Sequence, residues 1–215
     1  MAELPQDRST LRRLIETRLR DSHPLGEPGH ALLGGVTLES SGLVGQFYPQ
    51  TPVAAAVLIP IVDHPAGLTV LLTQRASHLR NHAGQISFPG GRIEEGETAL
   101  EAALREADEE ISLERAFIQV IGYLEPQLII SGFWVTPVVS FVRPGFALHL
   151  DSNEVETTFE VPLAHVLDPH NHRSRERRIG ETTVQVYDIP FGEHRIWGAT
   201  AGMLMTLYRL LTRDE

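Results

Sequence analysis

Residues 89–113 read PGGRIEEGETALEAALREADEEISL and join a glycine turn to an acidic helical pattern. At about 100° per residue, a helix over residues 98–111 places Glu106, Glu109 and Glu110 at positions i, i+3 and i+4 of one face. A different face collects apolar side chains, namely Leu100, Ala103, Leu104, Ala107 and Ile111. The stretch therefore predicts a helix with one core face and one face on which three carboxylates converge.

The acidic face would destabilise the helix unless a bound cation offsets the repulsion between its carboxylates. Like charges at these spacings destabilise an exposed helix by about 0.2–0.5 kcal/mol per pair. Hard divalent cations with oxygen ligands remove that repulsion directly. The glycines of the preceding turn also permit a backbone carbonyl to face a metal, or an amide to face a phosphate. The pattern thus favours a divalent-metal site that handles phosphate over a merely solvated acidic surface.

Charge and composition narrow the functional class. The formal net charge of -10 argues against a broad nucleic-acid surface. The absence of cysteine excludes disulfides, thiolate metal sites and a cysteine nucleophile. Residues 1–21 carry charges throughout, and no run approaches the ~18 apolar residues that a membrane span needs. We therefore expect a cytoplasmic protein that binds neither nucleic acid nor a membrane.

The rest of the chain predicts one α/β domain with a mixed sheet, because strands and helices do not alternate strictly. Strands are predicted over residues 52–62, 68–75, 117–124, 133–142 and 182–191, and helices over residues 9–20, 161–168 and 196–213. Pro137, inside one predicted strand, indicates an edge strand or a bulge. Residues 1–50 are interpreted as an N-terminal helix and an irregular lead-in packed on the domain of residues 51–215.

The central stretch resembles the Nudix box. The matching residues are Gly91, Glu97, Arg105, Glu106, Ala107, Glu109, Glu110 and Leu113. Ser112 departs from the pattern, since the family usually has a helix-ending glycine there; serine should alter the helix end without removing a ligand. The resemblance implies a Nudix hydrolase domain at residues 51–215 with an α/β/α sandwich around a central mixed β-sheet. It also implies hydrolysis of a nucleoside diphosphate linked to another moiety.

The resemblance also implies roles for individual residues. Mg²⁺ or Mn²⁺ would be bound by Glu106, Glu109, Glu110 and the Gly91 carbonyl, with Glu154 as a further carboxylate from outside the box. Glu109, Glu106 or an outside acid would accept the proton from the attacking water. Arg105 and Glu97 complete the catalytic set by bracing the loop and helix.

The stretch that precedes the box indicates which diphosphate compound is the substrate. Residues 71–91, LLTQRASHLRNHAGQISFPGG, resemble the signature that coenzyme A pyrophosphatases carry ahead of the box. The implied reaction splits coenzyme A, or its acyl or oxidised derivatives, into 3′,5′-ADP and 4′-phosphopantetheine. Because this small-molecule substrate is an anion, local cations and backbone donors are required. The candidate substrate-binding residues are Arg75, Arg80, His82, Gly90, Gly91 and Arg92.

Three other functions stay open. One is cleavage of ADP-ribose or another nucleoside diphosphate derivative, which activity independent of the 3′-phosphate would favour. Another is a non-catalytic Nudix domain that senses a nucleotide, although no box carboxylate is missing. The third is action on RNA ends or damaged nucleotides, against which the charge and the upstream signature argue. The resemblance also allows a homodimer.

Overall fold

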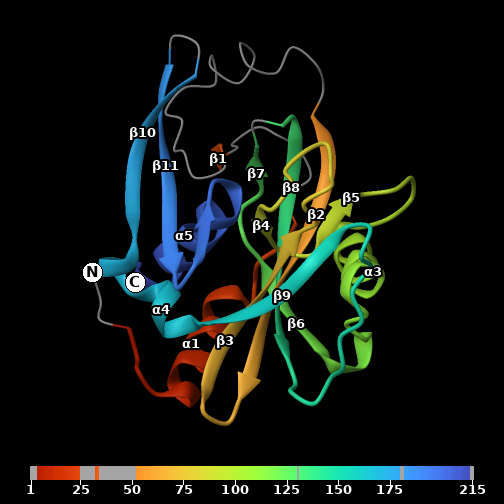
Figure 1. Cartoon of the computed structure of the whole chain (residues 1–215). Coiled ribbons are helices and arrows are strands. Elements are labelled where there is room, and N and C mark those ends of the chain that lie inside the picture. Colours follow the sequence, from red (N-terminus) through yellow and green to blue (C-terminus); the bar gives the residue numbers. More distant parts are fainter. Residues whose placement is uncertain (1–3, 25–31, 34–51, 130, 180–181, 214–215) are drawn as a thin grey trace.

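A mixed β-sheet with helices on both faces forms the centre of the protein (Figure 1). The structure is a computed structural model and describes residues 4–24, 32–33, 52–129, 131–179 and 182–213. The main sheet has the order β1-β7-β8-β2-β3-β4, with β5 on β2, β6 on β8 and β9 on β3. Its strands are β1 (Leu32–Leu33), β2 (Val53–His64), β3 (Gly67–Arg75), β4 (Ile86–Ser87), β5 (Gly90–Arg92), β6 (Ile118–Tyr123), β7 (Gln127–Leu128), β8 (Phe133–Val142) and β9 (Val155–Pro162).

A smaller antiparallel sheet follows in the C-terminal part. It consists of β10 (Arg173–Ile179), β11 (Thr182–Phe191) and β12 (His194–Trp197). The helices are α1 (Arg8–Leu19), α3 (Ala99–Ile111), α4 (Leu163–Leu167) and α5 (Ala199–Thr212), with short 3-10 turns at Arg115–Phe117 and Pro169–Asn171. Among the described residues, no helix is long and apolar enough to cross a membrane.

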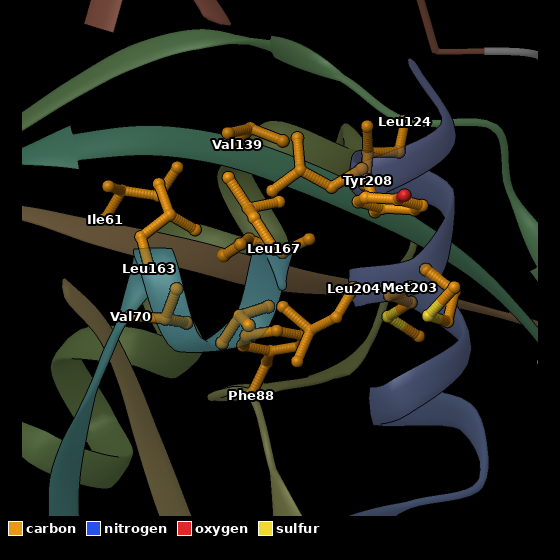
Figure 2. Packing of buried hydrophobic residues seen from close by; sticks show 14 of the residues in the cluster. Ile61, Val70, Phe88, Leu124, Val139, Leu163, Leu167, Met203, Leu204 and Tyr208 are labelled. Carbon is orange, nitrogen blue, oxygen red and sulfur yellow. The ribbon is translucent and has the colours of Figure 1, made fainter. Parts of the chain in front are cut away.

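Two clusters of buried side chains lie on opposite faces of the main sheet. One joins the sheet to α1, α4 and α5 and is built from large aliphatic and aromatic residues. Figure 2 shows its centre, where Leu163 and Leu167 of α4 meet Leu204 and Tyr208 of α5. The other cluster lies between the sheet and α3. Because successive side chains of a strand point to opposite faces, β2 and β8 contribute to both clusters and are buried on both sides.

The prediction from Pro137 was wrong, because β8 is a central strand. It pairs in parallel with β2 along its whole length, while β7 and β6 pair with its other edge. The Pro137 carbonyl accepts from the Leu124 N–H, at 3.1 Å, on that other edge. The missing proline N–H would point the same way, at the place where pairing passes from β7 to β6. The central position therefore costs no hydrogen bond to β2.

The sequence boundaries also need correction at the C-terminal end. Residues 196–213 were predicted as one helix, but α5 begins at Ala199 and the preceding residues form β12. Gly198, at φ 66°, makes the turn between the two elements. Strand β10, a run of charged residues, was not predicted, because its charges mask the alternation of a strand. Helix α1 forms as predicted, whereas most of the lead-in to residue 51 lies outside the described residues.

Helix α3 was predicted correctly in extent but not in rotation. Its buried residues include Ala103, Ala107 and Ile111 as expected, but Leu100 and Leu104 are only partly buried. Ala102 and Glu110 are buried instead. Small side chains let the helix lie close to the sheet, so the residues that face the sheet are alanines rather than leucines. The acidic face is consequently turned partly into the protein.

Candidate active site

A glycine turn brings the acidic helix against the sheet. Pro89 accepts a hydrogen bond from the Leu58 N–H at 2.9 Å, and β5 continues along β2. A Cβ atom added to Gly90 would lie 2.4 Å from the Ala56 carbonyl oxygen, and one added to Gly91 would lie 2.1 Å from Glu106 Oε1. Gly90 is therefore required by its close approach to the backbone of β2, whereas a side chain at position 91 would displace the Glu106 carboxylate.

The ends of α3 are well defined. Thr98 and Glu101 form a reciprocal capping box at the N-terminus. At the C-terminus Ser112 adopts the left-handed conformation, with φ 54° and ψ 38°, and its N–H donates to the Asp108 carbonyl at 2.8 Å. The helix end therefore has the geometry that glycine would give, contrary to the expected alteration, and the carboxylates of the last turn keep their positions.

The Arg105 guanidinium links the acidic helix to the glycine turn through several hydrogen bonds. It donates to both oxygens of Glu97 at 2.9 and 3.0 Å and to the Arg92 carbonyl at 3.0 Å. Its Nη1 also donates to Glu106 at 2.9 Å and to Glu109 at 3.0 Å. The Arg105 guanidinium and the Glu94 N–H lower the pKa of Glu97, and these carboxylates in turn raise the pKa of Arg105. These bonds support a bracing role for Arg105 and Glu97.

The three box glutamates lie in very different surroundings. The Glu109 side chain is 60% exposed and that of Glu106 is 16% exposed. Glu110 is buried, and its Oε2 has no hydrogen-bond partner. The convergence predicted from helical spacing is thus only partial. Among the residues that the structure describes, no three acidic or histidine side chains are gathered closely enough to hold a metal ion as they stand.

The electrostatics nevertheless fit a divalent cation. Burial raises the pKa of Glu110 to about 8, and the nearby charges of Glu106 and Glu154 add to the rise, while Arg75 and the Gly90 N–H oppose it. Burial is also the main reason why the pKa of Glu106 is raised. A buried carboxylate without a partner, beside two further carboxylates, would be relieved by an oxygen-ligated cation. The donor set, carboxylates and a backbone carbonyl, is the one that Mg²⁺ and Mn²⁺ prefer.

Chain folding brings two distant residues to this cluster. Glu154 lies immediately before β9, where its carbonyl accepts from the Ala76 N–H at 2.8 Å, and Arg75 is the last residue of β3. Both residues act electrostatically on Glu110. Glu154 and Arg75 thus lie near the acids, and the role of Glu154 as a metal ligand stays a prediction.

The remaining candidate residues lie farther out. Arg92 is exposed, and its guanidinium lies 5.6 Å from the centre of the Phe133 ring. Arg80 and His82 lie in the exposed loop between β3 and β4, where His82 Nδ1 is 2.7 Å from Gln85 Oε1. Of the predicted cations, the structure thus brings Arg75 to the acids and leaves the side chains of Arg80 and Arg92 at the surface.

One element of the site was missed in the sequence. Thr200, in the first turn of α5, donates to the Ile86 carbonyl at 2.9 Å and is buried. This bond anchors the strand that leads into the glycine turn, from the opposite face of the sheet. No local signal could have revealed it, because the two residues are 114 positions apart in the sequence.

Comparison with known proteins agrees with this geometry. The NUDIX domain profile matches residues 51–182. The uncharacterized Nudix hydrolase NudL of Escherichia fergusonii is 41% identical over 155 residues, which cover 71% of this chain and 80% of that protein. NudL of Escherichia coli K12 is also 41% identical over the same coverage.

Solved structures of lower identity are also similar to part of the chain. The Nudix hydrolase RenU of M. smegmatis is 23% identical with a TM-score of 0.47, covering 54% of this chain and 73% of that one. A C. elegans Ap4A hydrolase complex is 21% identical with a TM-score of 0.45, covering 51% and 80%. The mixed sheet between helices confirms the predicted Nudix-type α/β fold, and the profile match together with the NudL relatives shows that the chain belongs to the Nudix hydrolase family.

Proposed function

We propose that this Nudix hydrolase cleaves the diphosphate of coenzyme A, and of its acyl or oxidised derivatives, into 3′,5′-ADP and 4′-phosphopantetheine. The observation that carries the hydrolase chemistry is the buried carboxylate of Glu110, which lacks a partner for Oε2 and lies beside Glu106, Glu154 and Arg75. A site that existed only for stability would have paired or replaced this charge.

Mg²⁺ or Mn²⁺ is the proposed cofactor, as Nudix hydrolases generally need such ions. The residues that would hold it are Glu106, Glu109, Glu110, Glu154 and the Gly91 carbonyl. When bound, the ion would neutralise diphosphate oxygens and lower the pKa of a water molecule. Because Arg105 now engages Glu106 and Glu109, these two side chains would have to turn from it to complete the set.

Other side chains near the acids would bind the substrate, brace the glycine turn and accept a proton. Arg75, half-buried beside the acids, would contact the diphosphate, and exposed Arg92 would meet a phosphate farther out. Arg105 and Glu97 hold the glycine turn in place. Glu109 is the proposed proton acceptor, because its side chain is exposed and open to water, with Glu106 as the second candidate.

The coenzyme A assignment rests on the upstream signature and its place in the fold. Residues 71–91 run from β3 through the exposed loop and β4 to the glycine turn, so the signature borders the acidic cluster directly. The Ser77 N–H donates to Glu156 at 3.1 Å, which fastens the start of the loop to β9. A loop held at both ends beside the diphosphate site is a suitable place to select the moiety on either side of that diphosphate.

A product assay tests the assignment. Coenzyme A, dephospho-coenzyme A, ADP-ribose and damaged nucleotides are each incubated with the enzyme and Mg²⁺ or Mn²⁺, and products are identified by mass spectrometry. We expect the highest kcat/KM for coenzyme A, and lower values without the 3′-phosphate. A clear preference for ADP-ribose would overturn the coenzyme A assignment while leaving the hydrolase class intact.

A further inference from the structure

A hollow lies on the face of the sheet opposite α3. It has a volume of about 420 Å³ and is lined by Gln74, Thr157, Phe159, Glu193 and His194. Phe159 packs against the same buried cluster as α1 and α5, which fixes the face. We call this hollow the β9 cleft, and none of its residues belongs to the Nudix box.

The β9 cleft lies close to the acidic cluster along the chain. Gln74 immediately precedes Arg75 on β3, and its partner across the ladder is Thr157 of β9. Thr157 follows Glu154 by three residues, a distance of about 10 Å along an extended strand. In Figure 1, β9 runs from the neighbourhood of α3 to α4, past the lower end of β11. The cleft and the acids thus lie near the same ends of β3 and β9, on opposite faces of the sheet.

The lining offers a flat surface and a hydrogen-bonding rim. The rings of Phe159 and His194 stack with centroids 3.8 Å apart and an interplanar angle of 8°. Both rings are only half-buried, so the stack borders open space. The Gln74 amide, the Thr157 hydroxyl and the exposed Glu193 carboxylate surround it. The lining holds a carboxylate but neither lysine nor arginine, so it disfavours a phosphate group.

We propose that the β9 cleft binds the adenine base of the substrate. A purine ring would extend the Phe159–His194 stack, and its exocyclic amine would donate to Glu193 or to the Gln74 carbonyl oxygen. A flexible amide chain such as pantetheine would leave the flat surface unused, and a phosphate would meet the Glu193 charge. The identity of the base rests on the proposed function, since coenzyme A carries adenine.

Ligand binding without turnover tests this inference. Adenosine is titrated into the full chain in EDTA, and binding is followed by NMR through the ring protons of histidine. We expect saturable binding, with His194 resonances shifted, and weaker binding of purine riboside, which lacks the exocyclic amine. The His194→Ala variant should weaken adenosine binding about tenfold. His194→Phe should restore most of it, and His170→Ala, at an exposed site in the 3-10 turn Pro169–Asn171, should have no effect.

Several results would overturn the inference: no saturable adenosine binding, equal affinity in wild type and His194→Ala, or pantetheine shifting the same resonances instead. Turnover separates this inference from the proposed function. If coenzyme A is not a substrate but adenosine binding still depends on His194, only the coenzyme A assignment fails. If coenzyme A is cleaved and His194→Ala leaves both KM and adenosine affinity unchanged, only the β9 cleft proposal fails.

Discussion

The two faces of the main sheet are built on opposite principles. On the face of α1, α4 and α5, large apolar side chains fill the core, and Leu204 is fully buried among them. On the other face, α3 contributes mainly alanines to the core, and a buried carboxylate, Glu110, has one oxygen without a hydrogen-bond partner. The comparison indicates that the first face supplies stability, whereas the second gives up part of that stability to keep charge near the proposed diphosphate site.

Removal of the buried charge gives the largest expected effect on activity. Glu110→Gln keeps the shape of the side chain but removes a proposed metal ligand, so we expect kcat to fall by ~10²-fold or more. The free energy of unfolding in EDTA at pH 8 should not fall, because an uncompensated buried charge disappears. Steady-state kinetics and urea denaturation measure the two quantities. Wild-type turnover in this variant would remove the proposed metal site.

A cavity made in the core on the face of α1, α4 and α5 should lower stability and leave kcat nearly unchanged. Leu204→Ala removes buried methyl groups from the centre of the large cluster, and such changes cost about 2–5 kcal/mol of unfolding free energy. We expect kcat to stay within about threefold of wild type at a temperature where the variant remains folded. Denaturation followed by circular dichroism checks the loss. A large fall in kcat with unchanged stability would contradict the division between the two faces.

The stability of the metal-free protein should depend on pH through the α3 face. The pKa of Glu110 is raised from its ordinary value of 4.5 to about 8 in the folded state, mainly by burial. Its contribution is therefore complete below about pH 4.5 and is lost progressively as pH rises toward 8, on the order of a few kcal/mol in total.

Melting curves in EDTA between pH 5 and 8 measure this loss, with Glu110→Gln as the control that lacks it. Mg²⁺ added at pH 8 should raise the melting temperature of wild type more than that of the variant, because an ion that binds only the folded state stabilises it. Parallel pH profiles for the two proteins would show that Glu110 is not the group responsible.

The same contrast explains what the sequence could predict. The extent of α3 followed from local spacing, as did the strands with long apolar runs. The burial of Glu110 could not be predicted from the sequence, because the rotation of α3 about its axis depends on how its alanines pack against β2. Nor could the central place of Pro137, since the gap between β7 and β6 that tolerates it is a tertiary feature. The β9 cleft likewise joins strands that are distant in the sequence.

The smallest expected effect concerns the end of α3, where Ser112 stands in the left-handed conformation. This conformation costs an L-residue about 1–2 kcal/mol, and glycine avoids the cost. Glycine in turn loses about 0.5–1 kcal/mol through the greater freedom of the unfolded chain. The first effect is larger, so Ser112→Gly should stabilise the protein by about 0.5–1 kcal/mol, as urea denaturation would show. Because Glu109 and Glu110 keep their positions, kcat should stay unchanged. A destabilised variant would mean that the serine makes the helix end more stable than its backbone conformation indicates.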